Sequence, residues 1–265
     1  MLEPLPTLRA PERAPSPLVR NLPATAAFGW LRAGWNDFRT APGPSLGYGA
    51  LVVLVSYGVL WGLRAAGLLY LAFPAVSGFL IIGPFAALGL YEKSRRRSQG
   101  LGTTFLQMVL VRPGSGAQLA YAGLLLGIFV LFWLRSADLL YALFFGLNPF
   151  PGAGEALVNV LTTPRGWALI LVGSGIGGLF AAFAFALSLF SVPMLMAERR
   201  DALTALGLSF AMTTHNLAPC LVWGGIVAAG MVLSALTGLL ALAVVFPVLG
   251  HGTWHAWRAI HRVGP

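Results

Sequence analysis

An apolar stretch near the C-terminus most constrains how this chain can fold. It lies between a charged cluster at 198–201 and a histidine- and tryptophan-rich end at 251–261. The stretch covers roughly forty residues, about twice the ~20 that one membrane-spanning helix needs. Residues 234–238 near its middle read Ser-Ala-Leu-Thr-Gly, which is compatible with a tight turn. We therefore expect two spans here, at 217–236 and 238–257, arranged as a hairpin.

Composition makes lipid the solvent for most of the chain. The sequence is 57% hydrophobic and 9% charged, whereas soluble domains carry about 25% charged residues. The net charge of +9 comes from basic residues at the ends of apolar runs, which is typical of membrane topology and not of nucleic-acid binding. Cys220 is the single cysteine, so intrachain disulfides and cysteine-cluster metal sites are excluded.

Four further apolar runs predict spans at 45–63, 67–91, 117–137 and 164–196. The predicted fold is an all-α, polytopic membrane bundle of about six transmembrane helices in three hairpins, each preceded by a short interfacial helix. The integral membrane domain covers 24–265. Residues 1–23 are rich in proline and predict an extended or disordered cytoplasmic tail. The apolar segment 139–161 extends the third span or lies on the outer surface, and the sequence does not decide between these.

Basic residues set the expected orientation. In the six-span arrangement only Arg64, Arg135 and Arg165, of 17 lysines and arginines, fall on one side. Because basic residues concentrate in cytoplasmic loops, both termini are expected in the cytoplasm of a bacterial inner-membrane protein.

A possible internal repeat accompanies the hairpins. Residues 67–74 resemble 238–247 apart from two extra residues, and the second helix of each hairpin contains proline. A threefold repeat would follow a usual way of building membrane bundles, and the proline-containing helices are expected to kink.

The segment before the first span predicts an amphipathic helix. Its apolar face and the arginines at the edge of that face comprise Phe28, Leu31, Trp35 and Phe38, with Arg32 and Arg39. This pattern suits a helix lying in the lipid headgroup layer, and a soluble amphipathic helix is the alternative.

Two groups of polar residues are candidate sites. His251, His255 and Arg258 share a face of the last span. One interpretation is an aromatic and basic belt at the membrane interface, and a second is a site that binds a lipid headgroup or another anion. A third is that the two histidines hold a metal or haem. Arg135 and Asp138 can pair on one helix face and are functional candidates if they are buried in the membrane. No metal site or cofactor is expected, and His251 and His255 are only weak metal candidates.

The run from Gly173 to Gly178 matches the G-x-G-x-x-G pattern of dinucleotide-binding loops. No strand precedes it and the surrounding sequence is apolar and of helical length, which excludes that interpretation. Gly173, Ser174, Gly177 and Gly178 instead predict close helix packing. Serine and threonine residues lack the base partners of a nucleophile, so an enzyme is not expected.

Several short sequence segments resemble those of a known family. They are 35–42, which begin Trp-Asn-Asp-Phe-Arg, 83–92, 190–194 and 249–257. Together they resemble a domain-of-unknown-function family of proteobacterial predicted integral membrane proteins. The resemblance implies a bacterial inner-membrane protein with about six spans, and it carries over no catalytic or binding residues.

Three functions follow as hypotheses. The first is a non-enzymatic accessory, assembly or scaffold subunit of a membrane complex, motivated by small-residue packing and by the lack of a recognisable buried ionisable network. The second is a transporter or channel for a small solute or lipid. The third is a haem- or metal-binding membrane protein. The expected partners are the lipid bilayer and another membrane protein or further copies of the chain, without nucleic acid.

Overall fold

The computed structural model describes residues 18–68, 71–146 and 152–261, and no strand occurs in these ranges. The all-α prediction is therefore confirmed for this part of the chain. The helices are α1 (Ala26–Arg39), α2 (Pro42–Ala65), α3 (Ala72–Ala86), α4 (Leu88–Ser98), α5 (Phe105–Val109), α6 (Gly116–Phe145), α7 (Ala153–Thr162), α8 (Pro164–Ala197), α9 (Ala202–His215), α10 (Leu217–Leu236) and α11 (Leu242–Ile260). A short helix does precede each of α2, α6 and α10, namely α1, α5 and α9.

Four of these helices are long and apolar enough to cross a membrane. They are α2, α6, α8 and α10, with 24, 30, 34 and 20 residues. At 1.5 Å per residue they measure about 36, 45, 51 and 30 Å, against a hydrocarbon core about 30 Å thick. They overlap the expected spans at 45–63, 117–137, 164–196 and 217–236, and α6 extends past the expected end at 137 to Phe145.

The other two expected spans, 67–91 and 238–257, do not form long apolar helices in the described residues. The first is divided into α3 and α4, which meet at Ala87. Pro84 lies three residues earlier and cannot donate a helical hydrogen bond. The second corresponds to α11, whose C-terminal half carries histidines, tryptophans and Arg258. Because these residues lower its hydropathy, six spans stay a prediction.

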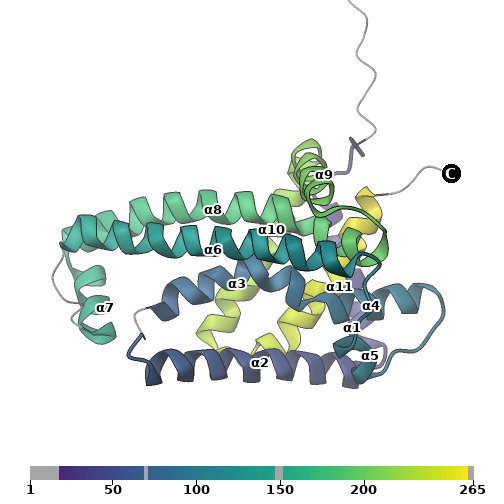
Figure 1. The fold of residues 1–265 in the computed structure, drawn as a ribbon, viewed down its shortest axis with the longest axis horizontal. Coiled ribbons are helices and arrows are strands. Elements are labelled where there is room, and N and C mark those ends of the chain that lie inside the picture. The colour runs from purple at the N-terminus through teal and green to yellow at the C-terminus, as the bar shows by residue number, and fades with distance from the viewer. Residues whose placement is uncertain (1–17, 69–70, 147–151, 262–265) are drawn as a thin grey trace, which may run out of the picture.

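Helix α11 lies at the centre of the bundle and packs against α1, α2, α4, α8 and α10 (Figure 1). Glycines bring two of these neighbours into backbone contact with it. A methyl group on Gly34 of α1 would lie 2.6 Å from the backbone nitrogen of Gly252. A methyl group on Gly49 of α2 would overlap the backbone of Ala243. Between these contacts α11 buries Phe246, Pro247, Val248, Gly250 and His251, whereas Val244 is exposed.

The pair formed by α6 and α8 reaches beyond the rest of the bundle. The two helices run side by side past the end of α2, and α7 packs against α8 near their tip (Figure 1). Helix α1 lies with α4, α5 and α9 at the opposite end, which we call the α1 end. In the described part of 139–161, α6 continues to Phe145 and α7 forms a separate helix.

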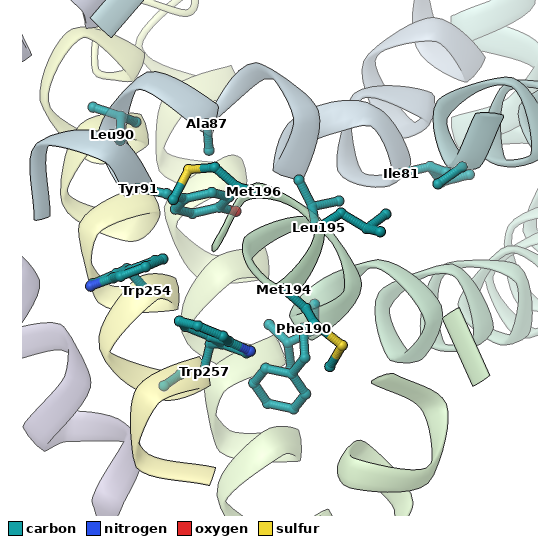
Figure 2. Packing of buried hydrophobic residues seen from close by; sticks show 14 of the residues in the cluster. Ile81, Ala87, Leu90, Tyr91, Phe190, Met194, Leu195, Met196, Trp254 and Trp257 are labelled. Carbon is teal, nitrogen blue, oxygen red and sulfur yellow. The ribbon is translucent and has the colours of Figure 1, made fainter. Parts of the chain in front are cut away.

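Part of the hydrophobic core lies where α4, α8 and α11 meet. Figure 2 shows Trp254 and Trp257 of α11 beside Tyr91 of α4 and Phe190 and Met194 of α8. All five side chains are at most 6% exposed. The two tryptophans therefore belong to the protein interior, where aromatic side chains bury large areas, and do not form the lipid-facing aromatic belt that their sequence position indicated.

Candidate functional site

Five polar residues from four helices meet in the interior at the α1 end. They are Asp37 of α1, Ser45 of α2, Lys93 and Ser94 of α4, and His251 of α11, and we call them the polar cluster. The exposed fraction of each is between 0% and 5%. Because burying polar and charged groups costs free energy unless they are paired, the hydrogen bonds among them decide what the cluster does.

His251 lies at the centre of the polar cluster. Its Nε2 is 3.0 Å from the Ser45 hydroxyl, and its Nδ1 is 2.8 Å from the Ser94 hydroxyl and 3.0 Å from the carbonyl oxygen of Leu90. A carbonyl oxygen can only accept a hydrogen bond, so Nδ1 carries the ring proton. Nε2 then accepts from Ser45, which fixes the tautomer of the ring.

Lys93 holds one end of the cluster. Its ammonium group donates to the Ser45 hydroxyl at 2.7 Å and to the carbonyl oxygen of Ala41 at 2.8 Å. Ala41 joins α1 to α2 with a φ of 57°, a left-handed conformation that is uncommon for a residue with a side chain. The ammonium group therefore stabilises the strained connection between α1 and α2. Burial lowers the pKa of Lys93 to about 8, although the Asp37 carboxylate acts in the opposite direction.

Asp37 holds the other end of the cluster. His255 Nε2 lies 2.9 Å from one carboxylate oxygen and Arg97 Nη1 lies 2.9 Å from the other. Burial raises the pKa of Asp37, but hydrogen bonds from His255 and Ser94 outweigh this effect, and the pKa lies below its ordinary value. The carboxylate is therefore charged at neutral pH and binds α1 to α4 and α11.

The hydrogen bonds of the polar cluster all run in one direction. Lys93 donates to Ser45, and Ser45 donates to His251. His251 Nδ1 lies 2.8 Å from the Ser94 hydroxyl, and Ser94 in turn lowers the pKa of Asp37. A positive charge thus lies at one end of the chain and a negative charge at the other. This arrangement compensates the buried charges and joins four helices that are far apart in sequence.

A second group of charged residues lies where α8 and α11 end. Glu198 accepts from His261 Nε2 at 2.5 Å and from Arg200 Nε at 2.7 Å. Burial raises the pKa of Glu198, but the bonds from Arg200 and His261 outweigh it and lower the pKa. Ser115 also donates to the backbone oxygen of Glu198. A shallow cavity of about 660 Å³ lies beside this group, lined by 114–118, 199–201 and Thr204.

The three residues of the predicted histidine site, His251, His255 and Arg258, have different surroundings in the structure. His251 points into the polar cluster and is 0% exposed, so it cannot reach a lipid headgroup as the sequence suggested. His255 is hydrogen-bonded to Asp37, and Arg258 is exposed. In the described ranges no group of three His, Cys, Asp or Glu residues is placed to hold a metal ion.

The pair Arg135 and Asp138 lies on the surface of α6. The two side chains are 3.7 Å apart, and 83% and 40% of their areas are exposed. Helix α6 continues beyond both residues to Phe145. A functional role for the pair stays a prediction, which depends on whether this part of α6 lies within the membrane.

The predicted interfacial helix packs on the bundle through one face, and its predicted contact with the lipid headgroup layer stays a prediction. In α1 the buried residues are Ala27, Trp30, Gly34, Asp37 and Phe38. Phe28 and Trp35 are exposed, Leu31 is partly buried, and Arg32 and Arg39 point away from the bundle. The face that packs on α11 includes Gly34 and Asp37. The charge of Asp37 had hidden this face from a pattern based on hydrophobicity.

The four small residues of α8 separate into two faces. A methyl group on Gly177 would lie 2.7 Å from Trp133 of α6, so this glycine lets the two helices approach. Gly178 has open space around it, and Gly173 meets only Leu169 of its own helix. Ser174 is exposed.

Sequence reasoning missed Asp37, Ser45, Lys93 and Ser94. Lys93 had been assigned to membrane topology because it belongs to a basic run, and Ser45 to the start of a span. One signal was available: Trp30, Gly34 and Asp37 recur at helical spacing. The partner positions on α4 and α11 lie far away in sequence, so the spacing alone could not identify them.

Comparisons with known proteins agree with this architecture. Residues 71–197, just under half of the chain, match the model of a family described as predicted integral membrane protein (DUF2189). The chain is an integral membrane protein. This follows from the match together with four helices able to cross a bilayer. No curated protein and no solved structure matches the chain.

Proposed function

We propose that this protein is a non-enzymatic accessory, assembly or scaffold subunit of a membrane protein complex. The observation that supports this is the closure of the polar cluster. Ser45 and His251 are 0% exposed, and a catalytic or transport site needs its reacting groups to be reached by a substrate. The ionisable groups instead bond to one another and fix α1, α2, α4 and α11, as a scaffold requires.

One of the two sequence arguments for this function was wrong. It rested on the lack of a buried ionisable network, and Asp37, Lys93 and His251 form such a network. Buried ionisable residues in a membrane protein are functional candidates by default. Their role here is inferred from their saturation: the Lys93 ammonium, both His251 ring nitrogens and both Asp37 oxygens have partners inside the protein.

The two other functions have less support. Transport was linked to Arg135 and Asp138, which are exposed on α6. Haem or metal binding was linked to His251 and His255. Both ring nitrogens of His251 are hydrogen-bonded, and His255 Nε2 binds Asp37, so a ligand would have to displace these contacts.

The proposal places the protein in a bacterial inner membrane with both termini in the cytoplasm. In that arrangement the α3–α4 pair supplies the second span and α11 the sixth. The basic residues of the α1 end support it, since Arg39, Arg96, Arg97 and Arg112 belong to α1, α4 and the loop after α5.

The native mass of the protein, extracted in mild detergent from its own membrane, tests the proposal. We expect the 28.0 kDa chain to be found with a different integral membrane protein in a fixed ratio. A chain that is found alone and moves a solute in liposomes would instead support transport. Haem absorbance, or bound metal by elemental analysis, would support the third function.

A further inference from the structure

A non-helical segment before α1 binds to helices from the other end of the chain. Residues 18–22 read Leu-Val-Arg-Asn-Leu, and we call them the latch. Both of its leucines are partly buried against the hydrophobic core. Figure 1 shows the start of the described chain, in purple, beside α9. The hydrogen bonds of the latch reach residues 196 and 240 positions further along the chain.

Asn216 holds the latch by its backbone. This residue lies between α9 and α10 and is 5% exposed. Its amide nitrogen donates to the carbonyl oxygens of Leu18 and Met212, each at 2.8 Å, and its amide oxygen accepts from the backbone nitrogen of Arg20 at 3.0 Å. A side-chain amide has two hydrogens to donate and one oxygen to accept, so all three groups are used. Two of the three bonds go to the latch.

The side chain of Arg20 forms a second attachment. Its Nε donates to the carbonyl oxygen of Ile260 at 2.7 Å, and Ile260 is the last residue of α11. A carbonyl group in the last turn of a helix has no partner within that helix, and the helix dipole favours a positive charge there. The latch therefore joins the end of α11 to the turn between α9 and α10.

The backbone turns sharply between the latch and α1. Asn21 has a φ of 49°, a left-handed conformation that asparagine adopts more readily than other residues with a side chain. Helix α1 has contacts of its own with α11, at Gly34 and at Asp37. The position of α1 therefore does not depend on the latch.

Parts of a folded protein can open locally while the core stays folded. We propose that residues 18–22 are a conformational latch, which opens and closes on the folded bundle. When it is closed, Asn216 and the Ile260 carbonyl hold it, and it ties the turn between α9 and α10 to the end of α11. When it is open, these two places are no longer joined through the latch.

The backbone amide of Arg20 reports on the latch, because it donates to the side chain of Asn216 and not to a helix. We expect hydrogen exchange of this amide, measured by mass spectrometry on the full chain in detergent, to be faster than that of the buried Trp257 in α11. Asn216→Leu removes the amide group at similar size. It should speed exchange at Arg20 by about tenfold or more and leave Trp257 unchanged.

Asp201→Ala is the matched control for this substitution. Asp201 caps the other end of α9, where it accepts from the Thr204 nitrogen at 2.8 Å. Its loss should leave exchange at Arg20 unchanged. A second pair of variants leaves the bundle itself intact: Asn21→Gly permits the left-handed turn, whereas Asn21→Val disfavours it. Only the valine should speed exchange at Arg20, by several-fold.

Three results would overturn the proposal. The first is an unchanged rate at Arg20 in Asn216→Leu, and the second is an equal rate at Arg20 in the two Asn21 variants. The third is exchange at Arg20 as slow as at Trp257 in the wild-type protein, since the segment would then open only when the bundle unfolds. All three are measured on the purified chain, so they are separate from the test of the accessory-subunit function, which needs a different protein.

Discussion

Gly34 of α1 and Gly252 of α11 touch along their backbones. A Cβ atom on Gly34 would lie 2.6 Å from the nitrogen of Gly252 and 2.5 Å from the carbonyl oxygen of Val248. These neighbours are backbone atoms that cannot rotate away, so α1 is seated on α11 only while position 34 has no side chain.

The substitution Gly34→Ala is therefore expected to destabilise the protein. Overpacking of a buried contact costs about 1–3 kcal/mol, and the loss should be read as a lower thermal unfolding temperature in detergent. Gly29→Ala is the matched control, since the same helix has open space at that position. The control should be neutral or slightly stabilising because alanine favours helix more than glycine by roughly 1 kcal/mol. Equal effects at both positions would refute the contact.

The charge of Lys93 should make stability depend on pH in the alkaline range. Its pKa is about 8 in the folded protein and 10.5 as an unperturbed side chain. Between these values the unfolded chain binds more protons, so the free energy of unfolding should rise as pH increases from about 8 to 10.5. Lys93→Met should remove this rise, by an amount on the order of 2 kcal/mol. Denaturant unfolding of both proteins at pH 7.5 and 9.5 compares them, and parallel pH profiles would contradict the prediction.

The buried pair of Asp37 and His255 should contribute more to the stability of the protein than the exposed pair of Arg135 and Asp138. Asp37→Asn breaks a buried network and is expected to cost about 3 kcal/mol. Asp138→Asn, an identical change at a pair whose arginine is 83% exposed, should cost less than about 1 kcal/mol. Unfolding midpoints of the two variants give the comparison directly, and a similar small loss in both would show that Asp37 does not hold α1.

Acid should destabilise the protein by protonating the Asp37 carboxylate. The pKa of Asp37 is lowered from 3.8 in the folded protein. Its contribution is therefore present above about pH 4 and is lost as pH falls through the lower folded pKa. The wild-type protein should lose stability over this acidic range, and Asp37→Asn should lose less of it. Unfolding measured from pH 5 downward tests this, and an equal acid sensitivity of the two proteins would be the contrary outcome.

The tautomer of His251 is a further prediction. The carbonyl oxygen of Leu90 requires the proton on Nδ1, and the Lys93 ammonium on the same Ser45 hydroxyl disfavours a second positive charge on the ring. Nitrogen-15 NMR of histidine-labelled protein should show one neutral, Nδ1-protonated ring at neutral pH. The spectrum of His251→Gln assigns that signal. A charged or Nε2-protonated ring at this position would reverse the direction of the hydrogen-bond chain.

The sequence predicted α2, α8 and α10 close to their final bounds, whereas α6 continues to Phe145 and so past the expected end at 137. The start of α8 was identified because Thr163 and Pro164 form a helix-starting pair, and the Thr163 hydroxyl indeed accepts from the Gly166 nitrogen. Local signals such as apolar length and capping act over a few residues, so they are visible in one sequence. The division of the second expected span at Ala87 was less visible, although Pro84 had indicated a kink.

By itself, the sequence determined that lipid surrounds most of the chain and that its secondary structure is helical. So few charges and such long apolar runs leave only helices in lipid, because every backbone polar group must be satisfied within the chain. The tertiary structure alone decided which polar residues meet. Asp37 and His255 are 218 positions apart, and Ser45 and His251 are 206 apart. Their pairing depends on the close contacts of α11 with α1 at Gly34 and with α2 at Gly49, which no local pattern encodes.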